Sequence, residues 1–164
     1  AMWAWIAAFY GDVFATSRSA SLVAFAVIAL GAAGSVVAGV LSDRRSRTRA
    51  AGQALRWSAG ASLVTGFLVG APAPVVVVVG LIWGFWVVAD SAQFSAIVTE
   101  TVDPRYVGTA LTMQLAAGFT LTVFTIFLVP LVRDGHGWGW AFAVLAPGPI
   151  LGAWAMHSLE RRDA

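Results

Sequence analysis

Two long apolar runs, residues 21–41 and 54–70, are joined in this chain by a short basic loop. A helix needs about 20 apolar residues to cross the hydrocarbon core of a bilayer, so each run has the length of one membrane span. A charged connection this short fixes how the two spans are placed, because both of its ends stay on one side of the membrane. The pattern therefore predicts a helical hairpin in a membrane.

Composition excludes most classes of soluble protein. Hydrophobic residues make up 59% of the chain and charged residues only 11%, whereas a soluble domain has about 25% charged residues. The net charge is +2, and the basic residues, all of them arginine, mostly lie between apolar runs and not on one face. This distribution is typical of membrane orientation, so we expect a lipid bilayer as a partner and no nucleic acid.

Six apolar segments follow one another along the chain and predict an all-α, polytopic transmembrane helix bundle that occupies residues 1–164 as one domain. The approximate helices are 2–17, 21–41, 54–70, 74–97, 107–132 and 138–158. The first spans only about 24 Å, less than a hydrocarbon core of about 30 Å. We expect that the chain begins inside a helix whose start is missing, the alternative being a short, tilted or interfacial segment.

The arginines predict the orientation of these spans. Only Arg18 and Arg133 fall on the side opposite to loop 42–53. The eight on the same side as that loop are Arg44, Arg45, Arg47, Arg49, Arg56, Arg105, Arg161 and Arg162. Because positive residues are retained on the cytoplasmic side, we expect this loop and both chain ends to be cytoplasmic, in a plasma membrane or a bacterial inner membrane.

The loop between the second and third segments also carries a motif. Its pattern is Gly39-x-Leu41-x-Asp43-Arg44-x-x-Arg47-x-Arg49. It resembles the signature cytoplasmic loop of the major facilitator superfamily of secondary transporters, which lies between the second and third helices of each six-helix half. The motif departs from the signature at Ser46, where glycine is usual, and at Thr48, where a basic residue is usual.

A second, weaker resemblance lies in residues 104–110, Pro-Arg-Tyr-Val-Gly-Thr-Ala, which are similar to the loop that opens the fifth helix of such a half. The resemblance covers essentially the whole chain, as the C-terminal half with its first helix truncated and its six helices in a 3+3 inverted repeat. It implies secondary active, alternating-access transport of a small solute, by symport or antiport with an ion or proton. It also implies a partner, an N-terminal transporter half that is missing from this chain.

The residues of the motif suggest how the loop works. Gly39 would let two helices approach closely at the membrane edge. Asp43 can complement a helix N-terminus, and Arg44, Arg47 and Arg49 belong to a candidate cytoplasmic gate, in which Arg44 and Arg47 can pair with acids or lipid phosphates. The alternative is that the arginines only anchor the hairpin on the cytoplasmic side.

Asp90 is the only acid well inside an apolar segment. An ionisable group in a membrane span is costly and is a functional candidate by default. Trp83, Trp86, Asp90 and Gln93 follow helical spacing and would share one face of a continuous helix, which suits a site for a polar solute or a proton relay. The alternatives are a carboxylate neutralised by burial, or one paired with Arg56 or with the missing half.

The fifth segment offers a facing polar side. Gln114, Gly118, Leu121 and Thr125 share one face, with Thr122 adjacent. We expect Gln114 to line the solute site, because its amide both donates and accepts hydrogen bonds. The threonines are expected to pack, since hydroxyl groups in membrane helices commonly bond their own backbone carbonyls.

Small residues predict close helix packing. Gly31, Ser35 and Gly39 form a ridge on the second segment, and Gly80 and Gly84 repeat the four-residue spacing on the fourth. Pro147-Gly148-Pro149 predicts a kink or break in the last segment.

Enzyme signatures are absent from the sequence. There is no lysine, hence no Walker A loop, and neither HExxH nor GxSxG occurs. The two histidines lack ligand spacing and there is no cysteine, so we expect no metal, no cofactor and no enzymatic activity. The alternative to a transporter is a non-transporting polytopic subunit or scaffold that binds partner proteins through its helices.

Overall fold

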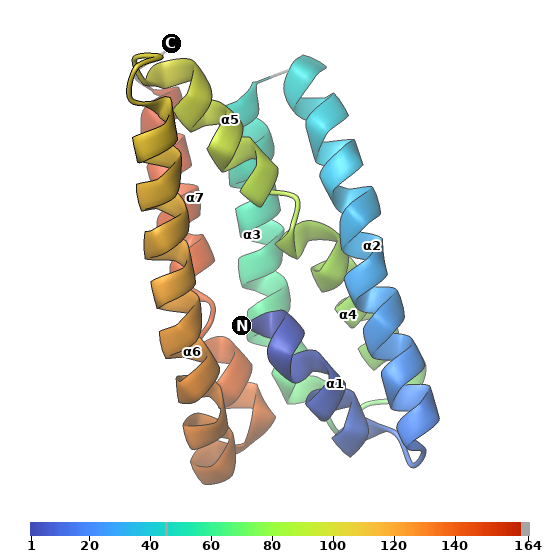
Figure 1. Cartoon of the computed structure of the whole chain (residues 1–164). Coiled ribbons are helices and arrows are strands. Elements are labelled where there is room, and N and C mark those ends of the chain that lie inside the picture. The colour runs from blue at the N-terminus through green and yellow to red at the C-terminus, as the bar shows by residue number, and fades with distance from the viewer. Residues whose placement is uncertain (45, 162–164) are drawn as a thin grey trace.

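The computed structural model describes residues 1–44 and 46–161, and within them the chain is helical with no strand. The elements are α1 (Met2–Val13), α2 (Ser17–Arg44), α3 (Arg47–Thr65), the 3₁₀ helix η1 (Gly66–Leu68), α4 (Ala73–Val87), α5 (Ser91–Thr101), α6 (Val107–Ala143) and α7 (Pro147–Glu160). Helix α3 contacts α2, α4, α5, α6 and α7 and lies at the centre of the bundle (Figure 1). The end where α2 stops and α3 starts, at the top of Figure 1, is called the loop end below.

Two stretches among the described residues are long and apolar enough to cross a membrane: α2, and residues 107–160, which combine α6 and α7. Only 6% of the most apolar part of the second stretch is buried. The total accessible surface is 9389 Å², against about 7,800 Å² for a soluble monomer of this mass. The excess is consistent with apolar helix faces that have no neighbour within this chain.

The other helices fail that test for identifiable reasons. Helix α1 ends at Val13, four residues before the predicted end, because Phe14 is extended (φ −106°, ψ 137°). Helix α3 begins at Arg47, seven residues before the predicted segment, since the polar turn 47–53 is helical as well. Arg47, Arg49 and Arg56 then lower the mean hydropathy of this helix.

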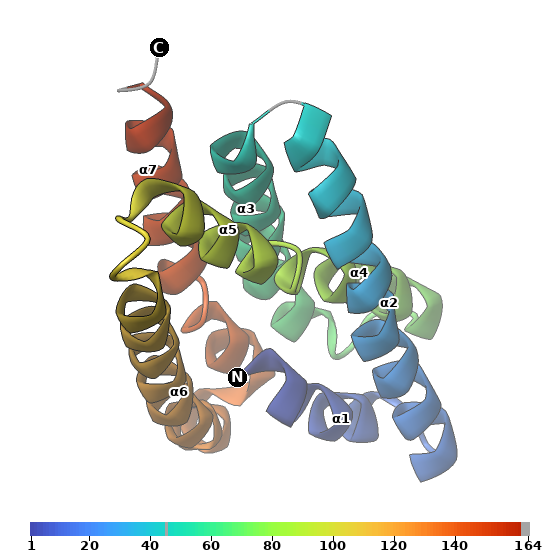
Figure 2. The ribbon, with the colours of Figure 1, turned by 45° about the horizontal axis from the view of Figure 1, so that its top comes forward.

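The predicted fourth segment, 74–97, is wrong as a continuous helix. Helix α4 ends at Val87, and α5 starts at Ser91. Across the break, the backbone N–H of Ala89 donates a hydrogen bond to the carbonyl of Trp86 (3.2 Å), and the N–H of Ser91 donates one to the carbonyl of Val88 (3.2 Å). Each of these hydrogen bonds joins residues three apart. Such tight turns inside a helix change its direction and often mark a functional hinge. Figure 2 shows α5 crossing the bundle at an angle to α4.

The predicted fifth segment, 107–132, also has different bounds, because the helix continues to residue 136. Gly137 then has φ +81° and ψ 177°, a conformation that favours glycine, and it interrupts α6 before the helical turn 138–143. The last predicted segment, 138–158, is divided by the turn at 144–146. Pro147 follows as the first residue of α7, so the predicted break beside it is confirmed.

Helices α2 and α4 pack closely against each other. A Cβ added to Gly34 would collide with the carbonyl oxygen of Phe85, and one added to Gly84 would collide with that of Val27. A Cβ on Gly31 would lie 2.8 Å from Cγ2 of Val88. These glycines therefore let the two backbones touch directly beside the α4–α5 break. The buried residues of α2 are Ala20, Ala24, Val27, Gly31, Gly34, Ala38 and Ser42.

An aromatic cluster lies at the end of the bundle opposite to the loop end. The ring of Phe9 from α1 lies 5.6 Å from that of Trp138 and 5.2 Å from that of Phe142. The indole Nε1 of Trp138 donates a 2.6 Å hydrogen bond to Oδ2 of Asp12, and the guanidinium of Arg133 lies 5.2 Å from the centre of its ring. These contacts hold α1 against α6.

Candidate functional site

The predicted gating motif lies mostly in helix. Helix α2 runs through Arg44 and α3 starts at Arg47, so the turn is shorter than the sequence pattern suggested. Arg45 falls outside the described residues. Gly39 has nothing within 4 Å of a built Cβ, so the prediction that it permits a close helix approach is wrong.

Two arginines of the motif join α3 to distant helices. Nε of Arg47 lies 2.8 Å from Oε1 of Glu100 at the end of α5, and its Nη2 lies 4.0 Å from Oδ1 of Asp43. Nε of Arg49 donates to Oε1 of Glu160 at the end of α7. We call these contacts the loop-end latch. Arg44 makes no ion pair among the described residues.

The two predicted tryptophans contact different helices. Trp83 is only 1% exposed, and its ring lies 5.1 Å from that of Phe142. Trp86 stacks on Trp57 of α3, with 6.2 Å between ring centres. The predicted common face that also included Asp90 and Gln93 is therefore wrong, because the break at 88–90 interrupts the helix that would have formed it.

Asp90 stands directly before α5. Its Oδ1 accepts a 3.2 Å hydrogen bond from the hydroxyl of Ser91. None of the ion pairs in the described part of the chain involves Asp90, so the alternative that it pairs with Arg56 is wrong. Gln93, in the first turn of α5, is 2% exposed. The break thus carries one carboxylate, one hydroxyl and one buried amide.

A pocket of about 540 Å³ separates α5 from α6, and we call it the α5–α6 pocket. Its polar lining consists of Ser91, Ser95, Gln114 and Thr122. Gly118 lies between Gln114 and Thr122 along α6 and also lines this pocket, whereas Leu121 and Thr125 of the predicted face do not. Gln114 of α6 therefore lines the same pocket as Ser91, the residue that follows Asp90.

A second, more apolar pocket of about 450 Å³ lies farther along α6, and we call it the α4–α6 pocket. It is lined by residues from several helices, among them Ser58, Ser62, Trp83, Leu121, Thr122 and Thr125. Thr122 lines both pockets. The hydroxyl of Thr125 donates to the carbonyls of Leu121 (3.0 Å) and Thr122 (2.9 Å), as predicted for a threonine in a membrane helix.

Three buried side-chain polar atoms in the described part of the chain have no hydrogen-bond partner: Nε1 of Trp83, Oε1 of Gln93 and Oε1 of Gln114. All three belong to residues that the sequence singled out. An unsatisfied buried group costs about 1–3 kcal/mol, so such groups are rare unless a ligand or water uses them. Trp83 lines the α4–α6 pocket and Gln114 lines the α5–α6 pocket, so each offers its free atom to a different cavity, and Gln93 lies beside the break at 88–90.

Several residues of the site were not predicted from the sequence. Glu100 and Glu160 complete the latch, and Ser91 and Ser95 line the α5–α6 pocket. The acids lie 53 and 111 residues from their arginines, where no local spacing connects them. The pair Asp90-Ser91 did offer a signal, because both residue types favour helix starts over helix interiors.

Comparison with protein families, with curated proteins and with solved structures finds no match to this chain. The function is therefore inferred from the motif and from the geometry of the pockets, the break and the latch.

Proposed function

We propose that this chain is one half of a secondary active transporter of the major facilitator type. It would carry a small polar solute across a cell membrane by alternating access, coupled to an ion or proton gradient. The observation that carries the proposal is the set of three buried polar atoms without partners, two of them on residues that line the pockets along α6.

The chemistry of these atoms indicates the class of solute. Gln114 offers the α5–α6 pocket an amide oxygen that accepts a hydrogen bond, and Trp83 offers the α4–α6 pocket one indole donor. The amide oxygen of Gln93 lies near the break, outside both linings. Among the described residues no arginine lines either pocket, and Asp90 directly precedes Ser91 of the α5–α6 pocket. A neutral or cationic solute rich in donors suits this set better than an anion.

The break at 88–90 supports a binding role for the fourth segment. Inside a bilayer, non-helical backbone is tolerated only where protein or a water-filled cavity surrounds it, and transporters place their sites at such interrupted helices. In the proposed six-span bundle, α4 with α5 forms one span, and the turn 138–143 with α7 forms another. The 3+3 inverted repeat and the cytoplasmic location of both ends belong to the same proposal.

The loop-end latch supports gating. The pairs Arg47–Glu100 and Arg49–Glu160 connect α3 to α5 and to α7 at the end where the arginines gather. Exposed ion pairs contribute about 0.2–1 kcal/mol each, which is enough to bias a balanced equilibrium and small enough to be broken in each cycle. The latch would close the loop end in one conformation and open in the other.

Exposed apolar side chains on the pocket side of α6 support a missing half. Leu115 and Phe119, which line the α5–α6 pocket, are 52% and 67% exposed. Phe127, also exposed, lies on the side of α6 away from Gly118 and would face lipid. A second six-helix half would supply the remaining wall of the path, so residues 1–164 alone are expected not to transport.

The same exposed side chains favour the second candidate, a non-transporting membrane subunit that binds partners through its helices. The variant Asp90→Asn separates the two. Cells producing the intact protein or this variant at equal membrane abundance would be compared by the mass-spectrometric profile of solutes depleted from the medium. A depletion that disappears in the variant supports transport. Unchanged depletion with loss of co-purifying proteins supports the scaffold.

Thiol labelling tests the path itself, because the chain has no cysteine of its own. Ser95→Cys and Thr122→Cys each place a thiol in the α5–α6 pocket. Phe127→Cys places one on the side of α6 that points away from this pocket. We expect a charged, membrane-impermeant methanethiosulfonate to react at least tenfold faster with the two pocket cysteines. Equal, slow reaction at all three positions would mean that the pockets are dry packing gaps, and it would count against transport.

A further inference from the structure

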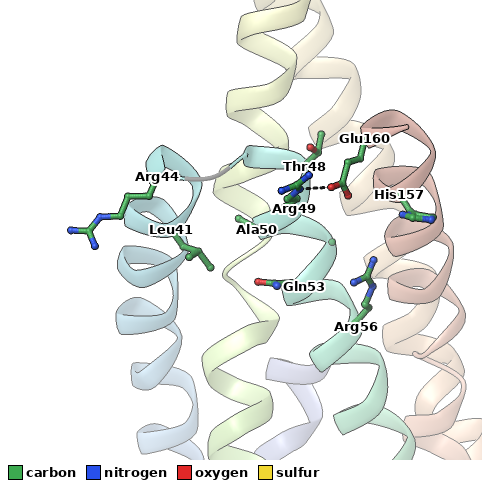
Figure 3. Close-up of a pocket in the computed structure, with 10 residues that line it drawn as sticks. Leu41, Arg44, Thr48, Arg49, Ala50, Gln53, Arg56, His157 and Glu160 are labelled. Carbon is green, nitrogen blue, oxygen red and sulfur yellow. Dashed lines mark hydrogen bonds and ion pairs between the residues drawn. The ribbon is translucent and has the colours of Figure 1, made fainter. Parts of the chain in front are cut away.

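A third pocket, of about 580 Å³, lies at the loop end on the outer side of α3. Helix α3 forms its floor, and the ends of α2 and α7 form its two sides (Figure 3). The polar residues that line it are Arg44, Thr48, Arg49, Gln53, Arg56, His157 and Glu160. It is separate from the two pockets along α6, with which it shares no lining residue.

The charge of this pocket is positive. Within the described part of the chain Glu160 is the one acid that lines it, and Arg49 already donates to that carboxylate. Arg56 makes no ion pair or side-chain hydrogen bond within residues 1–44 and 46–161, although it lies two turns inside α3. In Figure 3, Arg49 and Arg56 lie on the α7 side of α3, whereas Arg44 points away from them. The pocket thus holds a free guanidinium beside a paired one.

An apolar strip continues from the pocket along the same face of α3. Gly60, Leu63 and Val64 follow Arg56 at helical spacing, and all three are exposed. A Cβ on Gly60 would meet nothing within 4 Å, so the strip is open at that point. Trp57, exposed beside Arg56, is the residue type that gathers at the membrane–water interface. Cationic groups above and an apolar strip below reproduce the order of a lipid headgroup and its acyl chain.

We propose that this groove binds an anionic phospholipid of the leaflet at the loop end. The phosphate would accept hydrogen bonds from Arg56, with Arg49 beside it, and an acyl chain would cover Gly60, Leu63 and Val64. Basic pockets between helices on the cytoplasmic side of membrane proteins suit such headgroups. This inference rests on the membrane-spanning bundle of the proposed function but not on transport, so failure of either can be recognised separately.

Lipid retention by the purified full chain tests the proposal. The protein would be incubated in detergent with equal amounts of phosphatidylglycerol and phosphatidylcholine, and the lipids that co-elute with it would be quantified by mass spectrometry. We expect the wild type to enrich phosphatidylglycerol and Arg56→Gln to lower that enrichment about five-fold, the effect of about 1 kcal/mol for one basic residue at an anionic surface. Arg105→Gln, an exposed arginine outside the pocket at the same end, is the matched control and should change nothing.

A second variant protects the test from a folding artefact. Gly60→Leu adds a side chain to the apolar strip at a point where its Cβ meets nothing within 4 Å, and it keeps every charge. It should reduce retention of both lipids while helical circular dichroism stays unchanged. Equal retention of the two lipids by the wild type, or the same loss in Arg105→Gln as in Arg56→Gln, would overturn the proposal. Displacement of phosphatidylglycerol by millimolar inorganic phosphate would also overturn it, because the site would then take free phosphate.

Discussion

Arg47 and Glu100 are 53 residues apart in the chain, yet Nε of the arginine lies 2.8 Å from Oε1 of the glutamate. One belongs to the start of α3 and the other to the last turn of α5, the helix that begins at the break beside Asp90. Helix α5 thereby connects this contact at the loop end to Asp90, the candidate residue for coupling transport to protons. A change in the latch can therefore be followed by the reactivity of a residue of α5 that lines the α5–α6 pocket.

Neutralising Arg47 or Glu100, the two partners of one ion pair of the latch, should open the loop end. With Ser95→Cys as a reporter in the α5–α6 pocket, Arg47→Gln and Glu100→Gln should each raise the rate of thiol labelling from that side. An exposed pair worth up to about 1 kcal/mol corresponds to a change of up to about five-fold. The double variant should react no faster than either single variant, because both remove the same contact.

The control for this experiment is Asp134→Asn, which removes an exposed acid paired with Arg133 at the opposite end. It should leave the labelling rate of the reporter unchanged. Additive effects of Arg47→Gln and Glu100→Gln would show that the two residues act separately, and the latch would then have no role as a unit.

Because α2 packs closely on α4, substitution of one glycine of α2 by alanine should destabilise the protein, whereas the same substitution at another should not. Gly34→Ala places a methyl group against the carbonyl of Phe85, and overpacking of this kind costs about 1–3 kcal/mol. Gly39→Ala, five residues later on the same helix, meets nothing and should stabilise the helix by up to about 1 kcal/mol. Thermal unfolding of the two variants in detergent measures the difference, and equal midpoints would contradict the packing described for α2.

The same helix shows how far sequence reasoning reached. The presence of a small-residue ridge on α2 followed from composition, but the predicted members Gly31, Ser35 and Gly39 turn by about 40° per step around the helix. Gly31, Gly34 and Ala38 alternate three- and four-residue steps and stay within about 60° of one another. The ridge was therefore predicted, and its line along the helix was wrong beyond Gly31.

The α4–α5 break had only the weak local signal of Asp90 and Ser91, and the latch had none. Residues 85–93 contain neither proline nor glycine, the residues that most often interrupt a helix. The backbone around the break packs instead against Gly31 and Gly34 of α2, a contact that the local sequence does not show. The polar face of α6 was easier to predict, because Gln114, Gly118 and Thr122 lie at steps of four on an unbroken stretch of helix. Prediction from spacing succeeded where a helix stays regular and failed where a neighbour bends it.

The hydrogen bond between Asp12 and Trp138 should hold α1 in place. Asp12→Ala leaves the Nε1 of an almost fully buried indole without an acceptor, which costs about 1–3 kcal/mol. Asp12→Asn keeps an acceptor oxygen and should cost less than half as much. Thermal unfolding midpoints in detergent provide the comparison. If alanine and asparagine lower the midpoint equally, the negative charge near Arg133 matters and the hydrogen bond does not.

Gln114 allows a prediction with opposite signs for stability and for function. Its Oε1 is buried without a partner in the described residues, so the chain without solute carries a cost of about 1–3 kcal/mol at this position. Gln114→Leu removes that cost while keeping nearly the same volume, and it should raise the unfolding midpoint of the solute-free protein. It also removes an acceptor from the α5–α6 pocket, so depletion of the transported solute by producing cells should fall at least tenfold.

Gln53→Leu is the matched control for stability, because none of its side-chain atoms is among the buried polar atoms without a partner. It should not raise the midpoint. A stabilised Gln114→Leu with lost solute depletion identifies an amide kept for a ligand at the expense of the empty protein. If Gln114→Leu instead lowers the midpoint, the amide packs or bonds favourably in the absence of solute. The main support for a solute site between α5 and α6 would then be lost, whatever happens to transport.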